Sequence, residues 1–192
     1  MVMVNNLKPH KRPAQCGDIC LLIEPHPQAD LTPLRTRQQD LLHQHTGVII
    51  PHVHLSCQRF QAAEACKFSH FVDLVQQGIR ATMPFPLHAL ALQTLSVPVL
   101  NSTMLKWRID VTPALLRFNA MVAEAIYMSG LTTLYTPGFT SNLVSALRDF
   151  PFDYPEEQLQ DHYLPYHLFD AAKVVLSQIC GPNEFTILAR LY

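Results

Sequence analysis

The pattern of apolar and polar residues predicts alternating strands and helices. The run ICLLIEP (19–25) is short, apolar and closed by proline, which is typical of a buried strand. PHVHLSCQRF (51–60) and MLKWRIDV (104–111) alternate between apolar and polar residues, and FPLHALALQTLSV (85–97) is bounded by prolines. Each of these segments is therefore expected to be a strand, because alternation places one kind of residue on each face.

Helical spacing and capping residues predict the helices. Thr32 is expected to cap a helix whose first residue is Pro33 and which ends before Gly47. A second helix is predicted because Phe71, Val72 and Val75 stand 3, 4 and 7 residues after Phe68, which is the spacing of one apolar helix face. A third is expected to begin at residue 113, and a short one to lie over 141–150.

A partial repeat divides the chain into two halves. DLTP (30–33) and DVTP (110–113) each stand between a predicted strand and a predicted helix. The first helix leads into IIPHVHLS (49–56) and the second, later on, into YLPYHLFD (163–170), so each half presents a histidine on its returning strand. Since Thr-Pro is a common helix opening, chance can also produce this pair. The repeat predicts an α+β fold with two pseudo-symmetric lobes.

The polar face of 51–60 carries candidate chemistry. If the segment is a strand, His52, His54, Ser56 and Gln58 share one face. Two imidazoles that face each other across a groove suit phosphodiester cleavage, because a neutral one accepts a proton while a protonated one donates. A hydroxyl two residues along the same strand can bind the phosphoryl oxygens. His54 with Ser56 fits this description.

Three segments together resemble a known family. HVHLSCQRF, YHLFDAAKV and LKWRIDVTPALLRF are similar to passages of the 2H phosphoesterase superfamily, which contains 2′-5′ RNA ligase-like and cyclic phosphodiesterase proteins. The resemblance implies one two-lobed domain over 16–192, with antiparallel sheets around a central groove and helices outside. Residues 1–15 are polar and contain proline, so they are expected to form a flexible arm. It also implies a histidine followed two residues later by threonine or serine, once in each lobe.

That family motif implies the site residues. It assigns acid/base catalysis to His54 and His167 and phosphate binding to Ser56. The implied activity is that of a phosphodiesterase or reversible ligase, without metal or other cofactor, on 2′-5′ or cyclic phosphodiester bonds of RNA ends or small nucleotides. Many family members have proline directly before the histidine, which favours His52 instead. His162 is an alternative partner for the first motif.

Phe169 departs from the motif because it has no hydroxyl. It favours a second hypothesis, a degenerate member that binds a nucleotide, an RNA end or a protein partner without turnover. A zinc site is a rival for His-x-His, but Ser56 stands where a carboxylate is expected and no second cluster follows. Arg59, Lys106 and Arg108 are candidates for phosphate binding at the groove.

Composition narrows the class of protein. A formal charge of −1 gives no general attraction to nucleic acid, so a polyanion must be bound by a local site. No apolar run approaches the length of about 20 residues that a membrane-spanning helix needs. Five cysteines without a C-x-x-C pair favour free thiols. With no apolar leader after Met1, the sequence predicts a cytoplasmic protein without a membrane partner.

Overall fold

The structure is a computed structural model, and it describes residues 12, 14–61, 66–97, 102–135, 142–150, 165–181 and 184–192. The helices are α1 (Thr32–Gln44), α2 (Phe68–Ile79) and α3 (Pro113–Ser129). The strands are β1 (Ile19–Pro25), β2 (Val48–Ile49), β3 (Leu55–Phe60), β4 (Phe85–Val97), β5 (Ser102–Ile109), β6 (Leu143–Arg148), β7 (Tyr166–Gly181) and β8 (Glu184–Arg190). The predicted arm at 1–15 lies largely outside the described residues.

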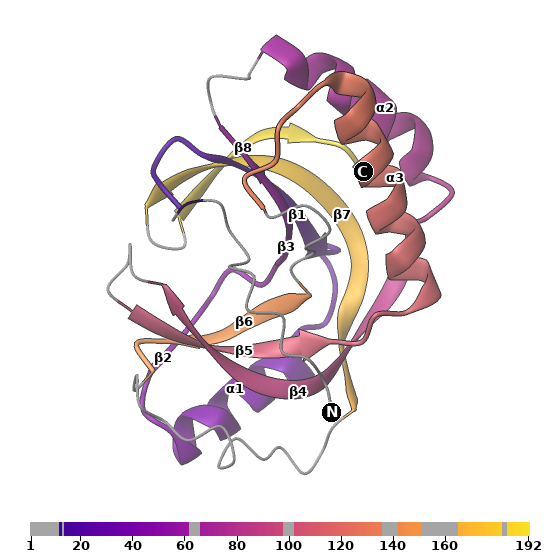
Figure 1. Ribbon diagram of the computed structural model, residues 1–192. Coiled ribbons are helices and arrows are strands. Elements are labelled where there is room, and N and C mark those ends of the chain that lie inside the picture. Colours follow the sequence, from indigo (N-terminus) through magenta and orange to yellow (C-terminus); the bar gives the residue numbers. More distant parts are fainter. Residues whose placement is uncertain are drawn as a thin grey trace, which may run out of the picture.

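The strands form one antiparallel sheet that returns on itself. Their order is β1-β3-β6-β5-β4-β7-β8, with β2 on β6, and β1 also pairs with β7. Figure 1 shows the strands curving round, with α2 and α3 together outside β7 and α1 at the opposite end of the sheet. The fold is therefore of the predicted class, with helices on the outside of antiparallel strands.

The sheet has two halves of the same construction. β1, α1 and β3 form one strand–helix–strand unit, and β5, α3 and β6 form the other. The two returning strands, β3 and β6, are neighbours in the sheet, with Leu55 opposite Val144. The repeat seen in the sequence therefore corresponds to the architecture, but β6 and not the segment at 163–170 is the returning strand of the second half.

The helix predicted over 141–150 is wrong, because 143–148 is strand β6. Val144, Ser145, Ala146 and Leu147 are all buried, so the segment shows no alternation that could identify a strand. A short apolar run of this kind fits a strand or a buried helix equally well. Pairing with β2, β3 and β5 decides in favour of the strand.

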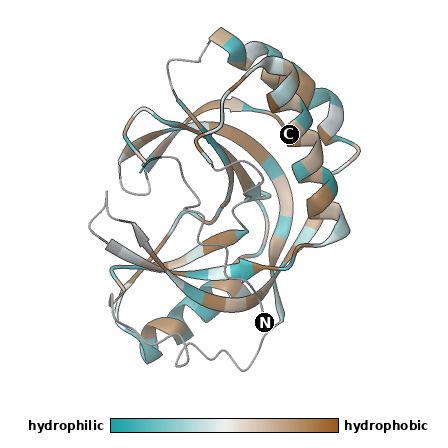
Figure 2. Ribbon diagram, viewed as in Figure 1, coloured by the Kyte–Doolittle hydropathy of each residue, from teal (hydrophilic) through white to brown (hydrophobic). Residues whose placement is uncertain are grey.

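One large apolar core fills the space between the sheet and the helices. Leu21, Leu55, Val144 and Trp107 contribute to it from successive strands, and each is at most 1% exposed. Leu34, Phe71 and Phe118 pack on it from the three helices. Figure 2 shows hydrophobic and hydrophilic residues interspersed along the curved strands and the helices, as alternation between a core face and an inner face requires. We call the sheet face turned away from the helices the inner face.

The two Thr-Pro helix openings differ in detail. At α3, the Thr112 hydroxyl accepts a hydrogen bond from the Leu115 backbone N–H at 3.2 Å and so caps the helix, which begins at Pro113 as predicted. At α1, the predicted Thr32 cap is wrong, because the helix already begins at Thr32 and no side chain caps it. The Asp30 carboxylate accepts a hydrogen bond from the Thr32 backbone N–H at 2.9 Å. Asp30, two residues before Thr32, thus fixes the backbone where α1 begins. None of the described helices is long and apolar enough to span a membrane.

Candidate active site

A bulge in β3 decides which residues of PHVHLSCQRF share a face. β3 begins at Leu55, and its register with β1 skips Cys57: Ser56 lies opposite Leu22, and Gln58 lies opposite Leu21. Leu21 belongs to the main core, whereas Leu22 belongs to a small cluster with Cys20 and Val175. Ser56 therefore faces the inner side and Gln58 the core side, so the predicted row is wrong at Gln58, because a bulge adds one residue and reverses the alternation.

His54 begins a row of polar residues across the inner face. Leu55 and Val144 point into the core, so the residues next to them point to the inner face. His54 directly precedes the Leu55–Val144 pair, and Ser145 stands on the same side of that pair on β6. Lys106 of β5 is the partner of Ser145, and its charge acts on His54. We call His54, Ser145 and Lys106 the first row.

A second row lies beside the first. The same register places Leu143 of β6 opposite Ser56, and Arg108 of β5 is the partner of Leu143. We call Ser56, Leu143 and Arg108 the second row. The two rows bring an imidazole, two hydroxyls and two cations to one face of three adjacent strands.

The His54 ring is buried and held in a defined orientation. It is 6% exposed, and its centroid lies 4.7 Å from that of His52 and 5.1 Å from that of Phe185. Nδ1 lies 3.1 Å from the His52 carbonyl oxygen, which can only accept, so Nδ1 carries the proton. Nε2 then has a lone pair and no partner among the described residues. Burial, with the charges of His52 and Lys106, lowers the pKa of His54 to about 3, so the ring is neutral at pH 7.

A buried carboxylate supports the segment that carries His54. Glu24 of β1 is 8% exposed, and its two oxygens contact His52 Nε2 at 2.9 Å and Lys173 Nζ at 3.4 Å. Burial alone raises the pKa of Glu24, but the hydrogen bonds and charges of His52 and Lys173 outweigh it, and the net pKa is lowered. The His52 carbonyl oxygen accepts a hydrogen bond from His54 Nδ1. By holding His52 in place, Glu24 therefore supports the orientation of the His54 ring.

Replacing Glu24 by glutamine is expected to destabilise the protein by about 1–3 kcal/mol, because His52 and Lys173 lose a charged partner. The lowered pKa of Glu24 means that its stabilisation is present above the unfolded-state pKa and is lost as the pH falls through the folded-state value. Urea unfolding between pH 3 and 7 should show a shallower acid loss for Glu24→Gln than for wild type.

The matched control for Glu24→Gln is Asp170→Asn, which removes the carboxylate of an exposed pair. His167 Nε2 lies 2.9 Å from Asp170 Oδ1, and the two side chains are 51% and 68% exposed. An exposed pair contributes about 0–1 kcal/mol. Equal losses for the two variants would contradict the supporting role of Glu24.

Lys106 brings a cation into the first row. It is only partly exposed, and burial lowers the pKa of its ammonium group to about 8. Its charge is close enough to His54 to contribute to the lowered pKa of that ring. The facing positions on the neighbouring strands are Gln93 of β4 and Ser145 of β6, neither of which is charged.

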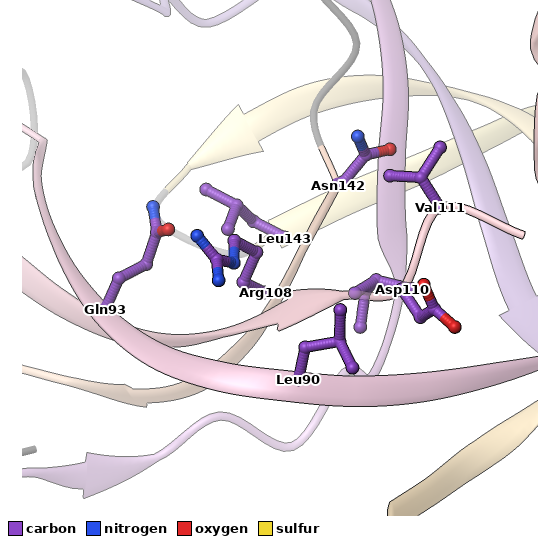
Figure 3. Close-up of a pocket in the computed structure, with 8 residues that line it drawn as sticks. Leu90, Gln93, Arg108, Asp110, Val111, Asn142 and Leu143 are labelled. Carbon is purple, nitrogen blue, oxygen red and sulfur yellow. The ribbon is translucent and has the colours of Figure 1, made fainter. Parts of the chain in front are cut away.

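A pocket of about 400 Å³ adjoins the second row. Arg108 and Leu143 belong to both, and Gln93, Asp110 and Asn142 add polar groups. Figure 3 shows Gln93 and Arg108 reaching into this space from β4 and β5, with Leu90 and Val111 among the apolar walls. Arg108 is exposed, so its guanidinium is available to an anion. The pocket can take a polar, partly planar group beside Arg108 and Leu143, the two residues that it shares with the second row.

His167 lies in a different part of the sheet from His54. It pairs with His88 of β4, with ring centroids 5.5 Å apart. Lys173, which reaches Glu24 beside the first row, is six residues further along β7, or about 20 Å of extended strand. The structure therefore does not bring His54 and His167 together across a groove, and a catalytic role for His167 stays a prediction.

The other predicted site residues divide between the inner face and the core. Arg59 is 5% exposed; its guanidinium lies against Asp18, and it donates to the Arg12 carbonyl, so it is not open to a phosphate. Phe169 is a core residue, 2% exposed. His52 is bound to Glu24. His162 lies outside the described residues. Within the described ranges, no group of three or more His, Cys, Asp and Glu side chains could hold a metal ion.

Sequence reasoning missed the β6 residues of the two rows. The signal for them is a second weak repeat, because HLSCQR (54–59) and LVSALR (143–148) share a serine and an arginine at the same spacing. The pairing of Leu55 with Val144 places these segments symmetrically, with Leu143 at the position of His54 and Ser145 at the position of Ser56. The segment contains no histidine, because leucine stands at the position that corresponds to His54.

The arrangement of strands and helices is similar to that of solved structures of other proteins. No family model and no curated protein matches the chain. Among solved structures, Escherichia coli LigT complexed with 3′-AMP matches with a TM-score of 0.51 and 13% identity over 92% of this chain and 97% of that chain. LigT in its apo form matches with a TM-score of 0.51 and 14% identity, over the same shares of the two chains. A structure described as a phosphoesterase matches with a TM-score of 0.51 and 13% identity, again over 92% and 97%. The chain therefore has a LigT-like fold.

Proposed function

We propose that the two rows bind a phosphate ester and that His54 acts as the base in its metal-independent cleavage. The observation that carries this is the state of His54: its Nδ1 proton is held by the His52 carbonyl, and Nε2 remains a proton acceptor. A neutral imidazole can accept a proton from a hydroxyl or water. The negative charge of a bound phosphate raises the pKa of His54 from its value of about 3, which makes the ring a stronger base when the substrate is present. The substrates we propose are nucleotides and RNA ends that carry a cyclic phosphate or a 2′-5′ link.

The remaining residues of the rows suit a phosphate. The hydroxyls of Ser56 and Ser145 can donate to phosphoryl oxygens as negative charge develops on them. Arg108 can pair with the phosphate in a bidentate manner, because its planar guanidinium presents parallel N–H groups. The adjoining pocket then takes the nucleoside, with its amides and apolar walls against the base.

Two independent likenesses support the proposal. The chain resembles the 2H phosphoesterase superfamily in the HVHLS segment, and its fold is similar to that of LigT, which has been crystallised with 3′-AMP. We further propose that the protein acts in the cytoplasm as one domain over 16–192, since all five cysteines are free thiols.

Hydrolysis of 2′,3′-cyclic AMP in the presence of EDTA tests this function, with ³¹P NMR to follow the product. We expect conversion to 2′- or 3′-AMP at an unchanged rate when the chelator is added. Turnover that requires a divalent metal contradicts the metal-independent mechanism. If the protein neither hydrolyses 2′,3′-cyclic AMP nor binds 3′-AMP, the proposal as a whole is contradicted.

A second candidate function is binding of the same ligands without turnover. Leu143 favours it, because the position related to His54 by the symmetry of β3 and β6 has no group that transfers a proton. Binding of 3′-AMP in a calorimetric titration, without hydrolysis of 2′,3′-cyclic AMP, would favour a binding protein over an enzyme.

A further inference from the structure

The β3–β6 pair shows what His54 lacks. Its symmetry relates His54 to Leu143, and Ser56 to Ser145. Both strands thus supply a hydroxyl, but only one supplies an imidazole. A ribose alkoxide leaves poorly unless it is protonated, so a site with one neutral base needs a separate proton donor.

Few described groups of the two rows can donate a proton. Serine hydroxyls are too weakly acidic, and the Arg108 guanidinium does not deprotonate in proteins. His52 is near His54, but its Nε2 is bound to Glu24. Lys106 remains, and it reaches the same face as His54 from the other side of Ser145, which lies between them in the first row.

We propose that Lys106 is the general acid of this site. The inference rests on the proposed function, and it assigns to β5 the task that a second imidazole would have on β6. In hydrolysis of a cyclic phosphate, the water oxygen bonds to phosphorus while His54 Nε2 takes its proton. The bond from phosphorus to one ribose oxygen breaks, and that oxygen takes a proton from Lys106 Nζ. Solvent then returns a proton from His54 to Lys106, and the site is restored.

The surroundings of Lys106 suit this task. Its neighbours on β4 and β6 are the uncharged Gln93 and Ser145, and the charged or titratable described groups nearby are His54 across β6 and Arg108 on its own strand. None of these is a carboxylate that would hold the proton on Nζ. Burial lowers the pKa of Lys106 to about 8, which makes it a far stronger acid than an exposed lysine and leaves it protonated at pH 7.

Two substrates with different leaving groups test the proposal. Lys106→Met is expected to lower kcat for 2′,3′-cyclic AMP by about 10²–10⁴-fold. With thymidine 3′-(4-nitrophenyl phosphate), the kcat of Lys106→Met is expected to fall by less than about tenfold relative to wild type, because nitrophenolate leaves without protonation. Lys106→Arg keeps the charge but cannot donate, so it should remain slow on cyclic AMP. In wild type, kcat/KM for 2′,3′-cyclic AMP should fall above about pH 8, and this alkaline decrease should be absent from the pH profile of Lys106→Met.

The outcomes separate this inference from the proposed function. Equal losses of Lys106→Met on both esters, or full activity of Lys106→Arg on cyclic AMP, overturn the role of Lys106 while wild-type turnover still supports the function. No turnover of either ester by wild type overturns both. Melting temperature and 3′-AMP binding show whether a variant is folded; we expect Lys106→Met to be at least as stable as wild type, because it removes a partly buried charge.

Discussion

Replacing His54 by alanine is expected to lower kcat for hydrolysis of 2′,3′-cyclic AMP by about 10²–10⁴-fold, the usual contribution of a general base. The ring is buried and contacts both His52 and Phe185, which also contact each other, and it is the only imidazole in the two rows. Because His54 is neutral at pH 7, its loss removes the proton acceptor and not a positive charge. Steady-state rates with EDTA present measure the effect.

The control for His54→Ala is His70→Ala, which removes an exposed histidine from α2 on the outside of the protein. It should leave the rate unchanged. His167→Ala addresses the pairing that the sequence predicts. We expect a far smaller loss of rate than for His54→Ala, because His167 lies outside the two rows, beside His88 and Asp170. A loss as large as that of His54→Ala would contradict this assignment and favour the pair His54 and His167.

Replacing Trp107 by alanine is expected to lower the free energy of unfolding by about 3–5 kcal/mol, the cost of deleting a large core side chain. Trp107 is 0% exposed, and its ring meets Tyr166 edge to face with centroids 6.2 Å apart. It stands on β5 between Lys106 and Arg108 and points to the opposite face, so it anchors the strand that carries both cations. Urea unfolding monitored by circular dichroism measures the loss.

Trp107→Phe is the matched control, because it keeps an aromatic ring in the core and should lose clearly less stability than Trp107→Ala. If Trp107→Ala lost less than about 1 kcal/mol, the packing of β5 against the helices would not be what holds Lys106 and Arg108 in place.

Local sequence patterns predicted most of the fold. The run at 19–25 and the segment at 85–97 coincide with β1 and β4, because prolines at or next to their ends mark the limits of an apolar segment. Helix α3 begins at Pro113 as predicted, since Thr112 and Pro113 form a cap that depends on adjacent residues alone. Such features need no knowledge of distant parts of the chain.

The site could be predicted only in part, because it depends on register between distant strands. His54 and Ser56 follow from alternation, but the bulge at Cys57, which turns Gln58 to the core side, arises from pairing with β1. Ser145 and Lys106 join His54 only through β6, a strand whose buried residues show no alternation. The proline and histidine of YLPYHLFD matched the repeat by spacing, while the structural counterpart of His54 is a leucine.

The most direct test of the central claim, that the two rows around His54 are the phosphate site, is a titration of the protein with 3′-AMP followed by ¹H–¹⁵N NMR of the histidine ring nitrogens. We predict a saturable shift of the His54 Nε2 signal, since we propose that this nitrogen acts on the bound phosphate ester, and no comparable shift for His167. A shift confined to His167 and His88, with His54 unchanged, would contradict it.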